Sequence, residues 1–139
     1  MEEILKKKPI ASFNDLEVYR NAYELSITVM TQIVPKLPES EKYDLKDQLS
    51  RSCKSVPRLI AEGYAKKHQR QGFQKYLDDA MGECNELVVS LSHCRDIYSQ
   101  YINKELCVKL IDVYDKTGRQ LYNLSEAWNN FKLKGRRIT

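Results

Sequence analysis

The feature that most constrains the fold is an unbroken heptad pattern in the second half of the chain. Apolar or small residues recur there at alternating spacings of four and three, which places them on one side of a helix. They are Phe73, Leu77, Ala80, Cys84, Leu87, Leu91, Cys94, Tyr98 and Tyr101. About four such heptads predict a long helix packed nearly parallel or antiparallel to its neighbours, at about 20°.

A second helix is expected at about residues 43–64; Gly63 either helps to close it or lies within a helix that continues past it. Pro57 lies inside this pattern, where it removes a backbone donor and should kink or loosen the turn before it, at a cost of about 3 kcal/mol in an ordinary helix interior. The inward face carries Leu45, Leu49, Ser52, Cys53, Val56, Ile60 and Gly63.

Two more apolar stripes predict the first and last helices. Pro35 and Pro38 should end the first one, and Asn14 is expected to cap its start, in a capping box with Glu17. Phe13 should pack on Val18 as a hydrophobic staple. The first stripe comprises Val18, Ala22, Leu25 and Val29, flanked by Tyr19, Tyr23, Met30 and Ile33, and the last comprises Leu106, Leu110, Val113, Thr117, Leu121, Leu124, Trp128 and Phe131.

Four stripes of similar length can close one core. The chain of 139 residues has only five Gly and four Pro, which argues against a turn-dense β-sandwich. We therefore expect an all-α protein, an antiparallel up-down four-helix bundle over residues 13–131. Residues 1–12 are expected to form a flexible basic arm, and residues 132–139 a basic, unstructured tail.

No apolar run approaches the ~20 residues of a membrane span. The N-terminus, MEEILKKKPI, lacks the features of a secretory signal. We expect a cytoplasmic protein without a membrane partner.

Positive charge is concentrated in the middle of the chain. Residues 45–75 carry eight basic and two acidic residues, a net charge of +6, against +4 for the whole chain. Such asymmetry suggests an anionic partner or an acidic surface on a neighbouring subunit. The candidate nucleic-acid-binding residues are Arg51, Lys54 and Arg58, on one helix face, and Lys66, Lys67 and Arg70, in the following basic segment. The alternative is a solvated helix face.

No catalytic constellation is evident. His68 and His93 are better read as surface or boundary residues than as catalysts or ligands, and no phosphate-binding loop or nucleophile elbow occurs. The four cysteines have no metal-ligand spacing and are expected to be buried, reduced thiols. They are Cys53, Cys84, Cys94 and Cys107. We expect no enzyme activity, no metal and no cofactor.

Three segments resemble a known family: FNDLEVYRNAYELS, LKDQLSRSCKSVPRLIAEGYAKK and FQKYLDDAMGECNELVVSL. They are similar to the four-helix-bundle proteins encoded in intervening sequences of bacterial 23S ribosomal RNA genes. The most specific part is the motif Ser55, Val56 and Pro57 followed by Ile60, Ala61, Glu62 and Gly63. Leu59 stands where the family usually has Asn, so any polar interaction of that Asn is missing.

The fold is also similar to the accessory variability determinant of diversity-generating retroelements, a homopentameric bundle that binds nucleic acid and a reverse transcriptase. This resemblance implies a ring of five subunits with basic residues near its channel, and a reverse transcriptase as a partner.

Two functions follow as hypotheses. The first is a non-catalytic protein that binds RNA or DNA through its basic face, in a ring that multiplies a weak patch by avidity. The second is a protein-protein interaction scaffold without affinity for nucleic acid, in which the basic face of the second helix pairs with the acidic face of the third helix of another subunit or docks an acidic partner protein.

Overall fold

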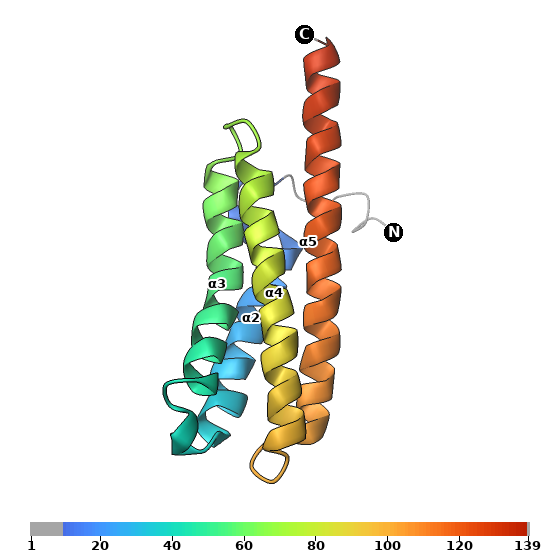
Figure 1. Ribbon diagram of the computed structural model, residues 1–139. Coiled ribbons are helices and arrows are strands. Elements are labelled where there is room, and N and C mark those ends of the chain that lie inside the picture. Colours follow the sequence, from blue (N-terminus) through green and yellow to red (C-terminus); the bar gives the residue numbers. More distant parts are fainter. Residues whose placement is uncertain (1–9, 139) are drawn as a thin grey trace.

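The protein is a bundle of four antiparallel helices. The computed structural model describes the backbone of residues 10–138 and the side chains of residues 10–131. Its long helices are α2 (Glu17–Thr28), α3 (Leu45–Ala65), α4 (Gly72–Ile97) and α5 (Lys104–Ile138), and they alternate in direction along the chain (Figure 1). No strand occurs in the part described. The predicted all-α, up-down four-helix bundle is confirmed.

Short helical turns connect these elements. A 3-10 turn, η1 (Phe13–Asp15), precedes α2, and a π-helical turn, η2 (Val29–Ile33), continues it. Two 3-10 turns, η3 (Val34–Lys36) and η4 (Glu39–Glu41), lead into α3. The turn at Pro35 thus ends the first helix as predicted, because proline cannot supply the backbone donor that another helical turn requires.

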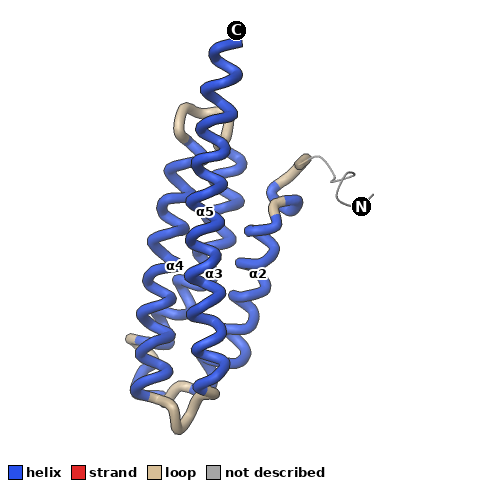
Figure 2. Tube along the Cα trace, turned by 90° about the vertical axis from the view of Figure 1, so that its right-hand side faces the viewer, coloured by secondary structure: helices blue, strands red, loops and turns tan. Residues whose placement is uncertain are grey.

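Helix α4 forms the centre of the core. Its predicted seam is buried from Phe73 to Cys94, and the helix packs extensively against both α3 and α5. Helix α2 packs mainly on α3 and lies to one side of the other three in Figure 2. The prediction for the last seam position, Tyr101, was wrong. Helix α4 ends at Ile97, and Tyr101 lies in the following turn, where it is 51% exposed and Ile102 is buried instead.

The buried face of α5 differs by one position from the prediction in its first half. Leu106 and Val113 are only half-buried, whereas the neighbouring Cys107 and Tyr114 are fully buried. Both choices keep spacings of three and four around Leu110, so periodicity alone did not separate them. Phe131, predicted on the stripe, is exposed.

The C-terminal segment continues α5. The helix runs to Ile138 and projects beyond the α3–α4 turn in Figure 1, so the unstructured tail expected from residue 132 is helical in backbone as far as residue 138. Lysine, arginine and leucine are good helix formers, which favours this continuation.

The start of the first helix also differs from the prediction. Ser12 is the N-cap of η1, its backbone N–H donates to Asp15 Oδ2 at 3.1 Å, and α2 begins only at Glu17. Asn14 therefore lies within the 3-10 turn. The Phe13 ring contacts Tyr19 at 4.8 Å between centroids. Most of the predicted arm at residues 1–12 lies outside the described residues.

Helix α3 continues through both Pro57 and Gly63, so Gly63 does not end it. Gly63 instead lies at a close contact between α3 and α4. A Cβ atom added there would lie 2.7 Å from Tyr76 Cβ and 3.1 Å from a ring carbon of Phe73. The glycine is thus required by interhelical packing, which sequence spacing did not reveal.

The four cysteines are buried and unpaired, as predicted. Burial raises the pKa of Cys53 to about 11 and the pKa values of Cys84 and Cys94 to about 12. These thiols are therefore neutral core residues.

None of the described helices combines the length and apolar character that crossing a lipid bilayer requires.

We expect Gly63→Ala to destabilise the protein. The added methyl group overpacks the α3–α4 contact, at about 1–3 kcal/mol, and the better helix propensity of alanine offsets only about 1 kcal/mol. Gly82 on α4 is the matched control, because a Cβ there has no neighbour within 4 Å. Urea unfolding should show a lower free energy for Gly63→Ala and a higher one for Gly82→Ala; equal gains would contradict the close contact.

Stability should also fall at alkaline pH. The folded-state pKa values of the buried thiols lie above their ordinary value of 9.0, so their contribution is complete below about pH 9 and is lost as the pH rises towards 12. Thermal unfolding between pH 7 and 11 measures this loss. Cys84→Ala should reduce the pH dependence relative to wild type, and an unchanged slope would contradict a buried thiol at this position.

Candidate nucleic-acid interface

Helix α3 brings three of the predicted basic residues to one exposed face. Arg51, Lys54 and Arg58 follow one another at spacings of three and four, and all three are exposed. They line a hollow of about 400 Å³ between α3 and α4, which we call the charged groove. Its remaining lining residues are Gln48, Ser52 and Ser55 of α3 and Glu83 and Glu86 of α4.

Local hydrogen bonds hold the two arginines of this face. Arg51 Nε donates to Asp47 Oδ2 at 3.0 Å, Ser55 Oγ donates to the Arg51 carbonyl at 2.7 Å, and Arg58 Nη2 donates to Ser55 Oγ at 2.8 Å. The Arg51 side chain remains 70% exposed. Exposed pairs of this kind contribute at most about 0.5 kcal/mol, so Arg51 can exchange its partner for a ligand.

The charged groove is not purely basic. Glu83 is partly buried, and burial together with the neighbouring Glu86 raises its pKa, while a hydrogen bond with Ser52 and the charge of Arg51 act in the opposite direction. The acidic residues of α4 therefore face the basic residues of α3 within one subunit. A polyanion that enters the groove meets attraction from one wall and repulsion from the other.

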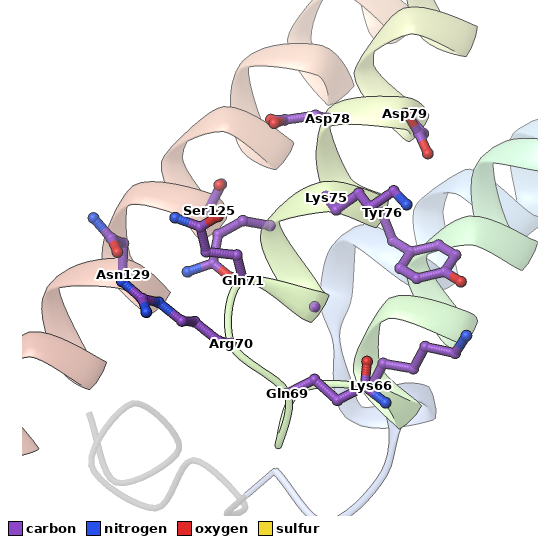
Figure 3. Close-up of a pocket in the computed structure, with 12 residues that line it drawn as sticks. Lys66, Gln69, Arg70, Gln71, Lys75, Tyr76, Asp78, Asp79, Ser125 and Asn129 are labelled. Carbon is purple, nitrogen blue, oxygen red and sulfur yellow. The ribbon is translucent and has the colours of Figure 1, made fainter.

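The other three predicted residues lie around the α3–α4 turn and do not join this groove. Lys66 and Arg70 line a larger hollow of about 660 Å³, which we call the end hollow, together with Lys75 and Asn129 (Figure 3). Arg70 extends towards Asn129 on α5, whereas Lys66 lies on the opposite side, with its Nζ 5.3 Å from the centre of the Tyr76 ring.

The environments of the two lysines differ. A hydrogen bond with Tyr76 raises the pKa of Lys66, which is fully charged at neutral pH. Lys67 is half-buried, and its Nζ lies 4.0 Å from the centre of the Tyr64 ring, a cation–π contact. The Lys67 side chain is therefore less accessible to a ligand than the exposed side chain of Lys66. Asp78 and Asp79, which also line the end hollow, point apart in Figure 3.

A third hollow was missed by the sequence analysis. It has a volume of about 240 Å³ and is lined by Phe13, Tyr19, Tyr23 and Pro57, with Lys54 and Arg58 at its border. We call it the aromatic hollow. Tyr19 and Tyr23 flank the predicted apolar stripe of the first helix; Tyr19 is half-buried against the core, whereas Tyr23 is 51% exposed. The spacing of four residues between these tyrosines, beside the apolar stripe, was the feature of the sequence that could have predicted a shared aromatic surface.

The residues of the family motif mostly serve packing. Val56, Pro57, Ile60 and Gly63 are buried. Leu59 is half-buried against the core, which fits an apolar residue at a position where the family usually has Asn.

The polar and boundary positions of the motif have other roles. Ser55 connects Arg51 and Arg58 through its hydroxyl, Ala61 lines the aromatic hollow, and Glu62 is exposed. The motif therefore shapes the surface that carries the cations.

The two histidines lie near opposite ends of α4. His68 is in the turn before this helix, His93 is in its last turns, and both are exposed. They are too far apart along the helix to act on one substrate together.

One comparison with known proteins identifies a family. The family model of the 23S rRNA-intervening sequence protein matches residues 14–123, from η1 to the middle of α5, and includes the motif and all six basic residues. No curated protein and no solved structure matches the chain.

Removal of the groove carboxylates should strengthen the binding of polyanions. In Glu83→Gln/Glu86→Gln the repulsive wall is neutral, and we expect about two- to tenfold tighter binding of a polynucleotide at low salt. Fluorescence anisotropy with a labelled oligonucleotide measures this change.

The control is Asp112→Asn/Asp115→Asn, which makes the same change in net charge on the exposed face of α5, where these residues pair with Lys116 and Arg119. If both variants bind equally well, only net charge matters and the groove is not the binding surface.

Proposed function

The chain belongs to the 23S rRNA-intervening sequence protein family, and from this premise we propose that it is a non-catalytic protein that binds nucleic acid, with RNA as the first candidate. The cations of the charged groove neutralise phosphates, and each neutralised phosphate releases counterions and favours binding at low salt. Arg70 and Lys66 at the end hollow add a second cluster of positive charge. Such contacts are tolerant of sequence.

The observation that carries this proposal is the convergence of Arg51, Lys54 and Arg58 on one groove. A merely solvated helix face needs no such arrangement. Ser55 bonds to Arg51 and Arg58 and holds the guanidinium of Arg58 beside the helix. Lys54 and Arg58 form no ion pair with any residue whose side chain the structure describes, so both are available to a phosphate.

A second candidate function is an assembly scaffold. It is favoured by the two signs of charge in one groove, because a second copy could offer its carboxylates to the α3 cations and its cations to Glu83 and Glu86. The ring of five subunits and the reverse transcriptase partner that the resemblance implies stay predictions. Light scattering of the purified protein measures the number of subunits.

The charge-reversal variant Arg51→Glu/Lys54→Glu/Arg58→Glu should lose polynucleotide binding. Three phosphate contacts per subunit contribute a slope of about −2 to −3 in a plot of log K against log salt, and the variant should lose this part of the slope. Binding is measured by anisotropy across a series of salt concentrations.

The matched control is Lys109→Glu/Lys116→Glu/Arg119→Glu on α5, where all three residues are exposed. Both variants carry three reversals of two charges each, which takes the net charge from +4 to −2. Binding that the control variant retains and the α3 variant loses supports the proposal. A wild-type protein that does not bind any polynucleotide contradicts it and leaves the scaffold, which is favoured further if the α3 variant dissociates into smaller species.

A further inference from the structure

The aromatic hollow exposes rings that a helical bundle would ordinarily bury. Tyr19 and Tyr23 lie one turn apart on α2, with ring centroids 6.2 Å apart and planes 34° apart. Phe13 from η1 contacts the Tyr19 ring edge-on, with planes at 75°, and so supports it from one side. The Tyr23 ring, at 51% exposure, offers much of its surface to a ligand.

The cations of the charged groove also border the aromatic hollow. Lys54 and Arg58 line both of them, so these two side chains form a ridge between a polar hollow and an aromatic one. Pro57 lies between them in the sequence and forms part of the floor. A ligand on this ridge therefore meets positive charge and an aromatic surface at the same time.

A further hollow beside the tyrosine pair also combines the rings with a cation. It has a volume of about 370 Å³ and is lined by the same Tyr19 and Tyr23 together with Asn14, Arg20 and Glu24. Arg20 Nη1 donates to the Asn14 carbonyl at 2.9 Å, which holds the guanidinium near the rings. Each of the two hollows that the tyrosine pair lines therefore has a cation in its lining, and the second also has the carboxylate of Glu24.

The size of the aromatic hollow limits its occupant. Its volume of about 240 Å³ is below the about 300–1,000 Å³ of pockets that enclose a whole drug-sized ligand. It suits one planar group that belongs to a larger molecule. Rings flanked by cations are the arrangement with which proteins bind single-stranded nucleic acid, because bases stack on aromatic side chains while the backbone follows the positive charge.

We infer that the aromatic hollow binds one unstacked base of a single-stranded nucleic acid, against Tyr19 and Tyr23, while Lys54 and Arg58 hold the adjacent phosphates. This inference rests on the proposed function and narrows it, because the bases of a duplex are stacked on each other and cannot enter the hollow. The partner is then a loop, an end or an unpaired strand.

The test compares strands with and without bases. One probe is an oligouridine strand in which a single base is replaced by 2-aminopurine. The other is an abasic oligomer of the same length, which keeps the phosphates. Wild type should bind the strand with bases about fivefold to a hundredfold more tightly than the abasic one, and should quench the 2-aminopurine fluorescence.

Variants of Tyr23 assign the effect to the ring. Tyr23→Leu keeps an apolar side chain but lacks a π-face and leaves only the Tyr19 ring, so its preference for the strand with bases and its quenching should both be weaker than in wild type, whereas Tyr23→Phe should behave as wild type. The matched control is Tyr122→Leu on α5, because Tyr122 has a similar exposure of 56% and should leave binding unchanged. Circular dichroism establishes that each variant is folded.

The outcomes separate this inference from the proposed function. Equal binding of both strands by wild type, with no effect of Tyr23→Leu, overturns the base site and leaves phosphate binding by the charged groove intact. The same conclusion follows if Tyr122→Leu weakens binding as much as Tyr23→Leu does. Absence of binding to every strand overturns both.

Discussion

The packing of α4 against both α3 and α5 is the contact on which the core and the charged groove depend. This helix buries a continuous seam from Phe73 to Cys94 against α3 on one side and α5 on the other. A seam with a strict heptad repeat holds neighbouring helices nearly parallel, at separations that the facing side chains set. Gly63 brings α3 so close to α4 that a methyl group would contact Tyr76. The charged groove is the outer edge of this same α3–α4 contact, so core packing sets the distance between its two walls.

Pro57 connects the core with the surface. A proline in a helix interior costs about 3 kcal/mol, because it removes a backbone donor and crowds the preceding turn. In this protein its ring is buried and forms part of the floor of the aromatic hollow, between Lys54 and Arg58. Burial of the ring offsets part of that cost. Loss of the proline would therefore alter the ridge of cations as well as the helix.

Basic and acidic residues occupy the two facing walls of the charged groove. The basic residues of α3 face Glu83 and Glu86 of α4, while the same Lys54 and Arg58 border an aromatic hollow formed by η1 and α2. In the proposed complex, a ligand with both phosphates and planar bases would meet aromatic rings on the α2–α3 side and the carboxylates of Glu83 and Glu86 on the α3–α4 side. These carboxylates would repel a polyanion and so favour its approach from the α2–α3 side.

The sequence by itself determined the fold class, the seam of α4, the inward face of α3 and the burial of Cys53, Cys84 and Cys94, because these depend on periodicity along one helix. It also predicted the exposed cations Arg51, Lys54 and Arg58, since spacings of three and four place them together. Only the tertiary structure decided the rest. In the packed structure, the buried positions of α5 are Cys107 and Tyr114, and not their neighbours Leu106 and Val113. Lys66 and Arg70 line the end hollow and lie outside the charged groove. The tertiary structure also brought Tyr19 and Tyr23 beside Pro57 to form the aromatic hollow. The physical reason is that each of these features depends on which residues of a second helix lie opposite, and the rotation and closeness of two packed helices are properties of the pair.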